Sequence, residues 1–236
     1  MFGSTITTLF AMAFVIALSL SASFADSKTQ VAPVTKSSIV MGWQSGSLLS
    51  SLVQLGWNNR MPLGIVIEGD GLCKAQVSDN KATISVDQLI RQITILDPNY
   101  VAEIEHNTLY VHPRVMSSST VDALNIELSR FTTEASSAQD IGISLWMYIR
   151  ALLVPQEGSA FSGGTQHGSE TLPPINVSNR SVHQILDFIV TMGQGGFWVM
   201  QEVPAQWQSN PKNIPYNIFS YSGDRYLVNS LGCHSD

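Results

Sequence analysis

The run SVDQLI at residues 85–90 decides the fold, because it marks the start of an amphipathic helix. Ser85 and Gln88 form a capping box, in which each side chain satisfies an otherwise unpaired amide at the helix start. The Asp97-Pro98 pair ends the pattern, because proline cannot continue a helix. The apolar side chains recur at helical spacing and share one face: Val86, Leu89, Ile90 and Ile93.

The same pattern returns as SVHQIL at residues 181–186, which aligns with residues 85–90 without a gap. A strand-prone segment precedes each helix, at residues 82–84 and 175–177. The alternative is a chance similarity over one helix, because capping boxes are common. We interpret the pattern as an α+β chain of two small modules, each with two helices packed on a small β-sheet.

Further elements extend outward from the two capped helices. The hydrophobic spacing predicts helices over residues 48–57 and 138–153. The strand-prone segments lie at residues 63–68, 100–104, 108–112, 124–128, 197–200 and 216–221. These elements place the first module at residues 38–115 and a second, divergent module at residues 120–222, with a tail at residues 223–236.

Residues 155–174 are rich in glycine and serine and predict a flexible loop within the second module. Residues 26–37 are mostly polar and contain Pro33, which is typical of a linker. Residues 1–25 carry no charged side chain, and the apolar run from Leu9 to Leu20 is too short to cross a bilayer comfortably. We expect a signal peptide cleaved near Ala25, although the missing basic residues leave a retained anchor as the alternative.

This leader predicts a periplasmic or secreted protein without stable membrane insertion after the leader is removed. The chain has 236 residues and a net charge of -6, with no run of Lys or Arg, which argues against nucleic acid as a partner. Only two cysteines are present, Cys73 and Cys233. In an oxidising compartment they could form one disulfide; the alternative is two unpaired thiols.

The sequence contains no nucleophile elbow, zinc-protease motif or phosphate-binding glycine loop. Glu68, Asp70 and Asp79 lack the further ligands of a calcium loop and are interpreted as a solvated turn. His183 is expected to be solvated near its helix start, and His106 to lie in a turn. We therefore expect no catalytic residue, no cofactor and no metal.

Aromatic residues concentrate near the end of the chain. Core packing explains most such rings, and the functional alternative is a contact surface for protein or carbohydrate. The candidates for that surface are Trp198, Trp207, Tyr216 and Tyr221.

Residues 44–113 resemble the short N-terminal domain of secretins and TonB-dependent receptors, and residues 120–222 resemble it more weakly. The resemblance rests on hydrophobic patterns: Leu48-Leu49 with Leu52-Val53, LGIVI at 63–67, ISVDQLI at 84–90 and NTLYV at 107–111. It implies an extracytoplasmic module that offers sheet edges and helix faces to other proteins, and it transfers no catalytic residue. The barrel-forming region of those proteins has no counterpart here, so ring building and transport are not carried over.

The sequence thus predicts an exported, non-enzymatic protein that makes protein–protein contacts at the envelope. The alternative is a secreted hydrolase or small-ligand binder that uses the 155–174 loop, with His167 and Glu170, and the C-terminal aromatic residues.

Overall fold

The fold is α+β, with its long helices packed on a β-sheet. The structure, a computed structural model, describes residues 34–36, 38–40, 42–69, 71–80, 82–153, 170–193, 196–202 and 216–221. The four long helices lie where the hydrophobic spacing predicts them: α1 (Leu48–Asn58), α3 (Val86–Leu96), α5 (Ala138–Leu153) and α6 (Val182–Met192). None of the helices in these ranges is long and apolar enough to cross a membrane.

The centre of the molecule is a five-stranded sheet to which both halves of the chain contribute. Its strands, in spatial order, are β15 (Tyr216–Tyr221), β14 (Phe197–Glu202), β3 (Leu63–Ile67), β7 (Thr108–Pro113) and β6 (Tyr100–Glu105). β3 runs parallel to both of its neighbours, β14 and β7, while β6–β7 and β14–β15 are antiparallel pairs. The two predicted modules therefore meet in one sheet.

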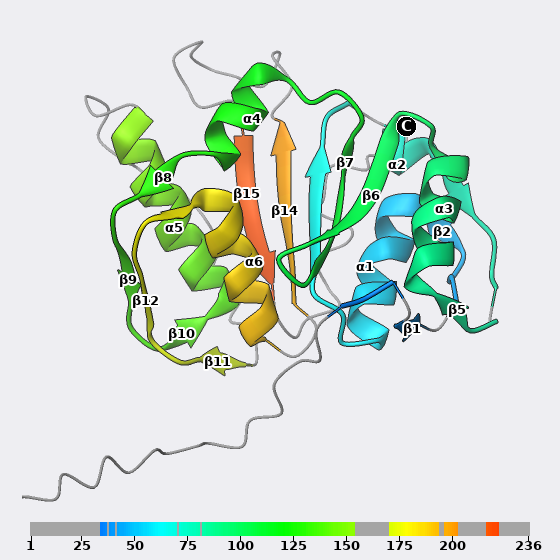
Figure 1. The fold of residues 1–236 in the computed structure, drawn as a ribbon, viewed down its shortest axis with the longest axis horizontal. Helices are drawn as coiled ribbons and strands as arrows, with labels where there is room; N and C mark the ends of the chain where they lie inside the picture. Colours follow the sequence, from blue (N-terminus) through cyan, green and yellow to red (C-terminus); the bar gives the residue numbers. More distant parts are fainter. Residues whose placement is uncertain are drawn as a thin grey trace, which may run out of the picture.

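Alternate residues of this sheet face two separate cores, because successive strand side chains point to opposite faces. Ile65 and Val199 lie in the core formed with α1 and α3. Val66, Tyr110 and Trp198 lie in the core formed with α5 and α6. Figure 1 shows the resulting three layers, with α5 and α6 on one side of the sheet and α1 and α3 on the other.

Within the described ranges, short strand pairs and two short helices complete the fold. The pairs are β1 (Ile39–Val40) with β5 (Ile84–Ser85), β2 (Gly46–Ser47) with β4 (Gln76–Val77), β8 (Glu127–Leu128) with β13 (Arg180–Ser181), β9 (Phe131–Thr133) with β12 (Ile175–Val177), and β10 (Ser136–Ser137) with β11 (Thr171–Leu172). The short helices are α2 (Gly71–Lys74) and α4 (Ser118–Leu124).

The structure departs from the sequence prediction at one strand, at the linker and at the end of the predicted loop. The predicted strand at residues 124–128 is wrong in its first part, because Leu124 ends α4 and only residues 127–128 form β8. Val34, placed in the linker, is buried against the first core. The loop predicted at 155–174 ends in β11, and its residues up to 169 lie outside the described ranges, as do the leader and the tail.

Candidate functional site

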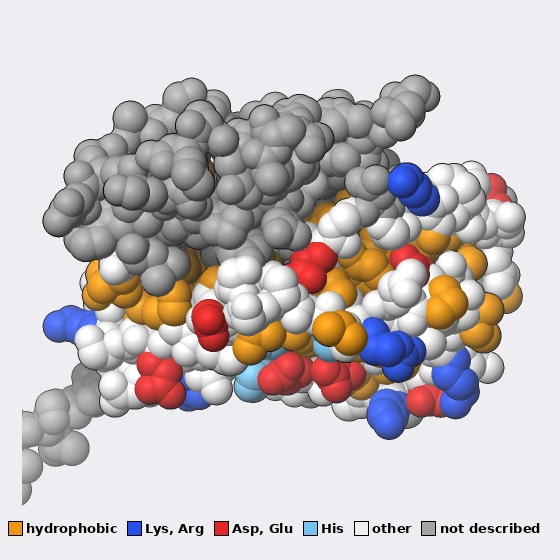
Figure 2. All heavy atoms as spheres, turned by 90° about the horizontal axis from the view of Figure 1, so that it is seen from above, with side chains coloured by type: hydrophobic (Ala, Val, Ile, Leu, Met, Phe, Trp, Pro, Cys, Tyr) orange, Lys and Arg blue, Asp and Glu red, His pale blue; other side chains and the backbone are white. Residues whose placement is uncertain are grey.

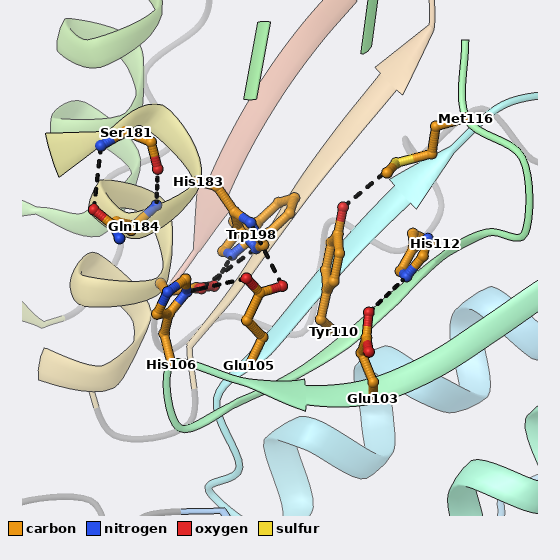
Figure 3. A network of polar contacts seen from close by, with 11 residues as sticks. Glu103, Glu105, His106, Tyr110, His112, Met116, Ser181, His183, Gln184 and Trp198 are labelled. Carbon is orange, nitrogen blue, oxygen red and sulfur yellow. Dashed lines mark hydrogen bonds and ion pairs between the residues drawn. The ribbon is translucent and has the colours of Figure 1, made fainter. Parts of the chain in front are cut away.

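A cluster of polar side chains lies where the β6–β7 turn meets α6 (Figure 3). Glu105 and His106 come from the end of β6 and the turn, and His183 and Asp187 come from α6. Trp198 of β14 lies against them from the sheet. We call these five side chains the histidine cluster. It joins the first half of the chain to the second.

The β6–β7 turn places His106 beside α6. His106 and Asn107 form a two-residue connection, with Glu105 and Thr108 paired on either side of it. Both turn residues have positive φ, at 48° and 65°. Positive φ at both central positions is the geometry of the tight hairpin turn that matches the twist of the strands. Asparagine and histidine adopt this region more readily than most residues with side chains.

The capping box of α6 marks where the helix starts. Ser181 Oγ accepts from the backbone amide of Gln184 at 3.2 Å, and Gln184 Oε1 accepts from the amide of Ser181 at 3.3 Å. The helix starts at Val182, so His183 and Asp187 lie one turn apart on the same side. That side is directed at the β6–β7 turn and at Trp198.

Asp187 is the centre of the hydrogen-bond network and is only 1% exposed. The indole Nε1 of Trp198 donates to Oδ1 at 2.8 Å. Nδ1 of His106 lies 3.0 Å from Oδ2, where it can donate a second hydrogen bond. Burial raises the pKa of Asp187, and the hydrogen bonds from Trp198 and His106 act in the opposite direction. The carboxylate is therefore held in place by groups from both halves of the chain.

His183 is 8% exposed and packs among aromatic rings. Its ring centroid lies 4.4 Å from that of Tyr110 and 5.4 Å from that of Trp198. Burial, followed by the nearby His106 and His112, lowers the pKa of His183 to about 4. The imidazole is therefore neutral at neutral pH and keeps a lone pair on one ring nitrogen.

The polar contacts of His183 are incomplete. Nε2 lies 3.3 Å from Oδ2 of Asp187, and Nδ1 lies 3.9 Å from Oε2 of Glu105. The first contact lacks hydrogen-bond geometry, so Nε2 has no hydrogen-bond partner within the described part of the chain. One potential ligand atom from each of Glu105, His106 and His183 lies within 4.8 Å of the other two. This set can hold a metal ion.

A polar surface extends from the cluster along β6 and β7. Nε2 of His112 lies 3.1 Å from Oε1 of Glu103, and the His112 ring stacks on Tyr110 with centroids 4.5 Å apart. Burial raises the pKa of the Tyr110 hydroxyl, so this group is protonated at neutral pH. Figure 2 shows histidine side chains beside acidic side chains on the face seen from above. We call Glu103, Glu105, His106 and His112 the β6–β7 polar face.

The turn after β3, interpreted from the sequence as solvated, instead holds α4 in place. Glu68 accepts hydrogen bonds from the amide of Ser117 at 3.0 Å and from its hydroxyl at 2.9 Å. The hydroxyl of Thr120 also donates to Glu68. Asp79 accepts from the amide of Ser45 at 2.6 Å, and Asp70 lies outside the described residues. Both described carboxylates therefore have structural partners.

The structure corrects two predicted positions in the functional set. Trp198, a candidate for a contact surface, is fully buried and donates to Asp187. His183, expected to be solvated, is buried, because its helix face packs on the sheet. His106 lies in the turn, as predicted.

The other predicted site residues are described only in part. Tyr216 and Tyr221 are the first and last residues of β15, of which only the backbone is described, and Trp207 lies outside the described ranges. Cys73 is disulfide-bonded. Cys233, the other cysteine of the sequence, and His167 of the predicted loop lie outside the described ranges.

Sequence reasoning missed the histidine cluster because its members lie far apart along the chain. The available signal was local: His183 and Asp187 stand four residues apart in a helix that is otherwise apolar except for Gln184 and Thr191. Nothing in the sequence indicated that the β6–β7 turn would meet this helix. The chain has no match among family models, curated proteins or solved structures.

Proposed function

We propose that this chain is an exported, non-enzymatic envelope protein that binds other proteins through the β6–β7 polar face and the adjoining edge of β6. The observation that carries the proposal is the position of β6 at the end of the central sheet. Among the described residues, no strand pairs with its outer edge. An edge strand of six residues has backbone groups available for a further strand.

The side chains beside this edge favour a basic partner. Glu103 is 60% exposed and Glu105 is 41% exposed, and both extend from β6 on the face opposite α3. An extended segment that adds to a sheet edge gains affinity from main-chain hydrogen bonds and specificity from its side chains. We therefore expect the partner to present an extended segment with Lys or Arg at alternate positions.

Two features of the sequence support the export and the binding role. The uncharged leader at residues 1–25 ends in a small-residue stretch typical of signal-peptide cleavage. The resemblance of residues 44–113 to the short N-terminal domain of secretins and TonB-dependent receptors implies a module that contacts other proteins outside the cytoplasm.

A photo-crosslinking amino acid at position 103 tests this function in cells that express the full chain. We expect it to give discrete crosslinked products in the envelope fraction. The matched control is position 91 on α3, because Arg91 is similarly exposed, at 65%, but lies on another surface. Equal crosslinking from both positions, or none from position 103, would overturn the proposed binding surface. Recovery of the chain only from the cytoplasm would overturn the proposed export.

A further inference from the structure

The histidine cluster contains a buried imidazole, that of His183, which its hydrogen-bond network does not use. A buried Asp187 needs hydrogen-bond donors, and Trp198 and His106 supply them at 2.8 and 3.0 Å. This network is satisfied without His183. Yet His183 is buried beside it, and its Nε2 has no hydrogen-bond partner among the described residues. Leaving a buried polar atom without a partner is unfavourable, and a bound ligand at Nε2 would remove that cost.

The cluster also has the geometry of a metal site. Glu105, His106 and His183 bring one ligand atom each to within 4.8 Å of one another. Ligands of a tetrahedral ion are separated by roughly 3–4 Å when each bond is about 2.0–2.2 Å long. Small side-chain movements would therefore bring the three atoms to binding distance. His106 and Glu105 are partly exposed, which lets an ion enter from solvent.

The donor types select the class of ion. Two imidazoles and one carboxylate suit Zn²⁺ and related transition metals. Ca²⁺ and Mg²⁺ prefer oxygen ligands throughout. Nδ1 of His106 lies 3.0 Å from Oδ2 of Asp187, and a carboxylate that accepts from one ring nitrogen typically fixes the tautomer and orientation of a histidine that binds a metal through the other.

We propose that Glu105, His106 and His183 bind a Zn²⁺ ion at the junction of the β6–β7 turn and α6, with Asp187 orienting the imidazole of His106. The ion joins a turn of the first half to a helix of the second. Because the ion binds the folded arrangement, it stabilises the fold, and the stabilisation grows with the logarithm of the ratio of free zinc to the dissociation constant. Three protein ligands leave a fourth position on a tetrahedral ion, which water can fill.

Zinc titration of the untagged, mature protein tests the proposal by isothermal calorimetry after the protein is treated with a chelator and dialysed. We expect one Zn²⁺ per chain and a higher melting temperature with zinc. His106→Asn and Glu105→Gln should each weaken binding by roughly tenfold or more and remove the thermal shift. Asparagine is chosen at position 106 because it tolerates the positive φ of the turn.

The matched control is Glu103→Gln, which removes a carboxylate from the same strand outside the proposed ligand set. It should leave zinc affinity unchanged, and circular dichroism checks that all variants are folded. His183→Gln is a secondary variant, because a buried substitution could also unfold the chain. Zinc binding that survives unchanged in folded His106→Asn and Glu105→Gln would overturn the proposal, as would no binding by the unmodified chain.

Discussion

Gly64 shows how the absence of one side chain makes room for an aromatic ring of the neighbouring strand. It lies directly opposite Trp198 in the parallel pairing of β3 with β14. A Cβ atom at this position would lie 2.5 Å from the indole ring carbons of Trp198. The absence of a side chain at position 64 therefore gives the indole the space from which it reaches Asp187.

Gly64→Ala should lower the free energy of unfolding by about 1–3 kcal/mol, because the indole must move from a packed position. The measurement is chemical denaturation within a double-mutant cycle with Trp198→Phe. A smaller ring relieves the overlap, so Gly64→Ala should cost less in the Trp198→Phe background. Equal costs in both backgrounds would show that the indole does not require the glycine.

Tyr100 connects the edge strand β6 to the end of β3 through its hydroxyl. The hydroxyl donates to the carbonyl oxygen of Glu68 at 3.1 Å and accepts from the amide of Glu68 at 3.2 Å. Burial raises the pKa of Tyr100 to about 12. The hydrogen bond from the Glu68 backbone lowers this pKa, whereas the negative charges of the Asp97 and Glu68 side chains raise it. The folded state therefore holds the phenol proton more tightly than the unfolded state does.

Tyr100→Phe should lower the free energy of unfolding by about 1–3 kcal/mol at pH 7, because two backbone groups lose their partner. The stabilisation by the neutral phenol is complete below pH 10 and is lost as pH rises through 12. Chemical denaturation at pH 7 and between pH 10 and 12 checks this. The difference between the two proteins should shrink over the alkaline range, and a constant difference would contradict the raised pKa.

At the scale of elements, α3 and α6 begin in the same way. Each has a serine N-cap whose hydroxyl accepts from the N3 amide and a glutamine that returns the hydrogen bond. The periodicity and the capping boxes were both present in the sequence, so both helices were predicted with their starts. Local chemistry determines these elements, and sequence reasoning is strongest for such cases.

Ser85→Ala and Ser181→Ala should each lower the free energy of unfolding by about 1 kcal/mol, because one helix amide loses its acceptor. Thermal or chemical denaturation measures the change. Ser→Thr at the same positions is the control, because threonine keeps an oxygen that can accept the bond. An alanine variant as stable as the original chain would show that solvent replaces the cap without cost.

The predicted strand at 124–128 failed because a distant residue decides the structure there. Glu68, at the end of β3, accepts hydrogen bonds from Ser117 and Thr120 at the start of α4. This contact stabilises the first turn of a seven-residue helix that includes Leu124. The alternation of Leu124, Ile126 and Leu128 indicated a strand, but it carries no information about Glu68, which lies far earlier in the chain.

At the scale of the whole molecule, β3 is the strand that makes one body from two similar halves. All five of its residues are buried, and it pairs in parallel with β7 of the first half and β14 of the second. A continuous apolar strand is typical of a sheet covered on both faces. The apolar sequence at 63–67 thus indicated a strand in the middle of a sheet, but it could not identify β14 as the neighbouring strand. Pairing between distant strands depends on the packing of the complete chain.

This arrangement predicts that the two halves unfold together. Leu186→Ala creates a cavity in the core of the second half and should cost about 2–5 kcal/mol. If the shared sheet couples the halves, the free energy that protects the amides of α1 and β7 from hydrogen exchange should fall by the same amount as the stability of the chain. Mass spectrometry of peptides from those elements measures it, and Leu52→Ala in α1 provides the reciprocal experiment with readout in α6. Loss of protection confined to the half that carries the substitution would show instead that the halves fold as independent modules that happen to share an edge.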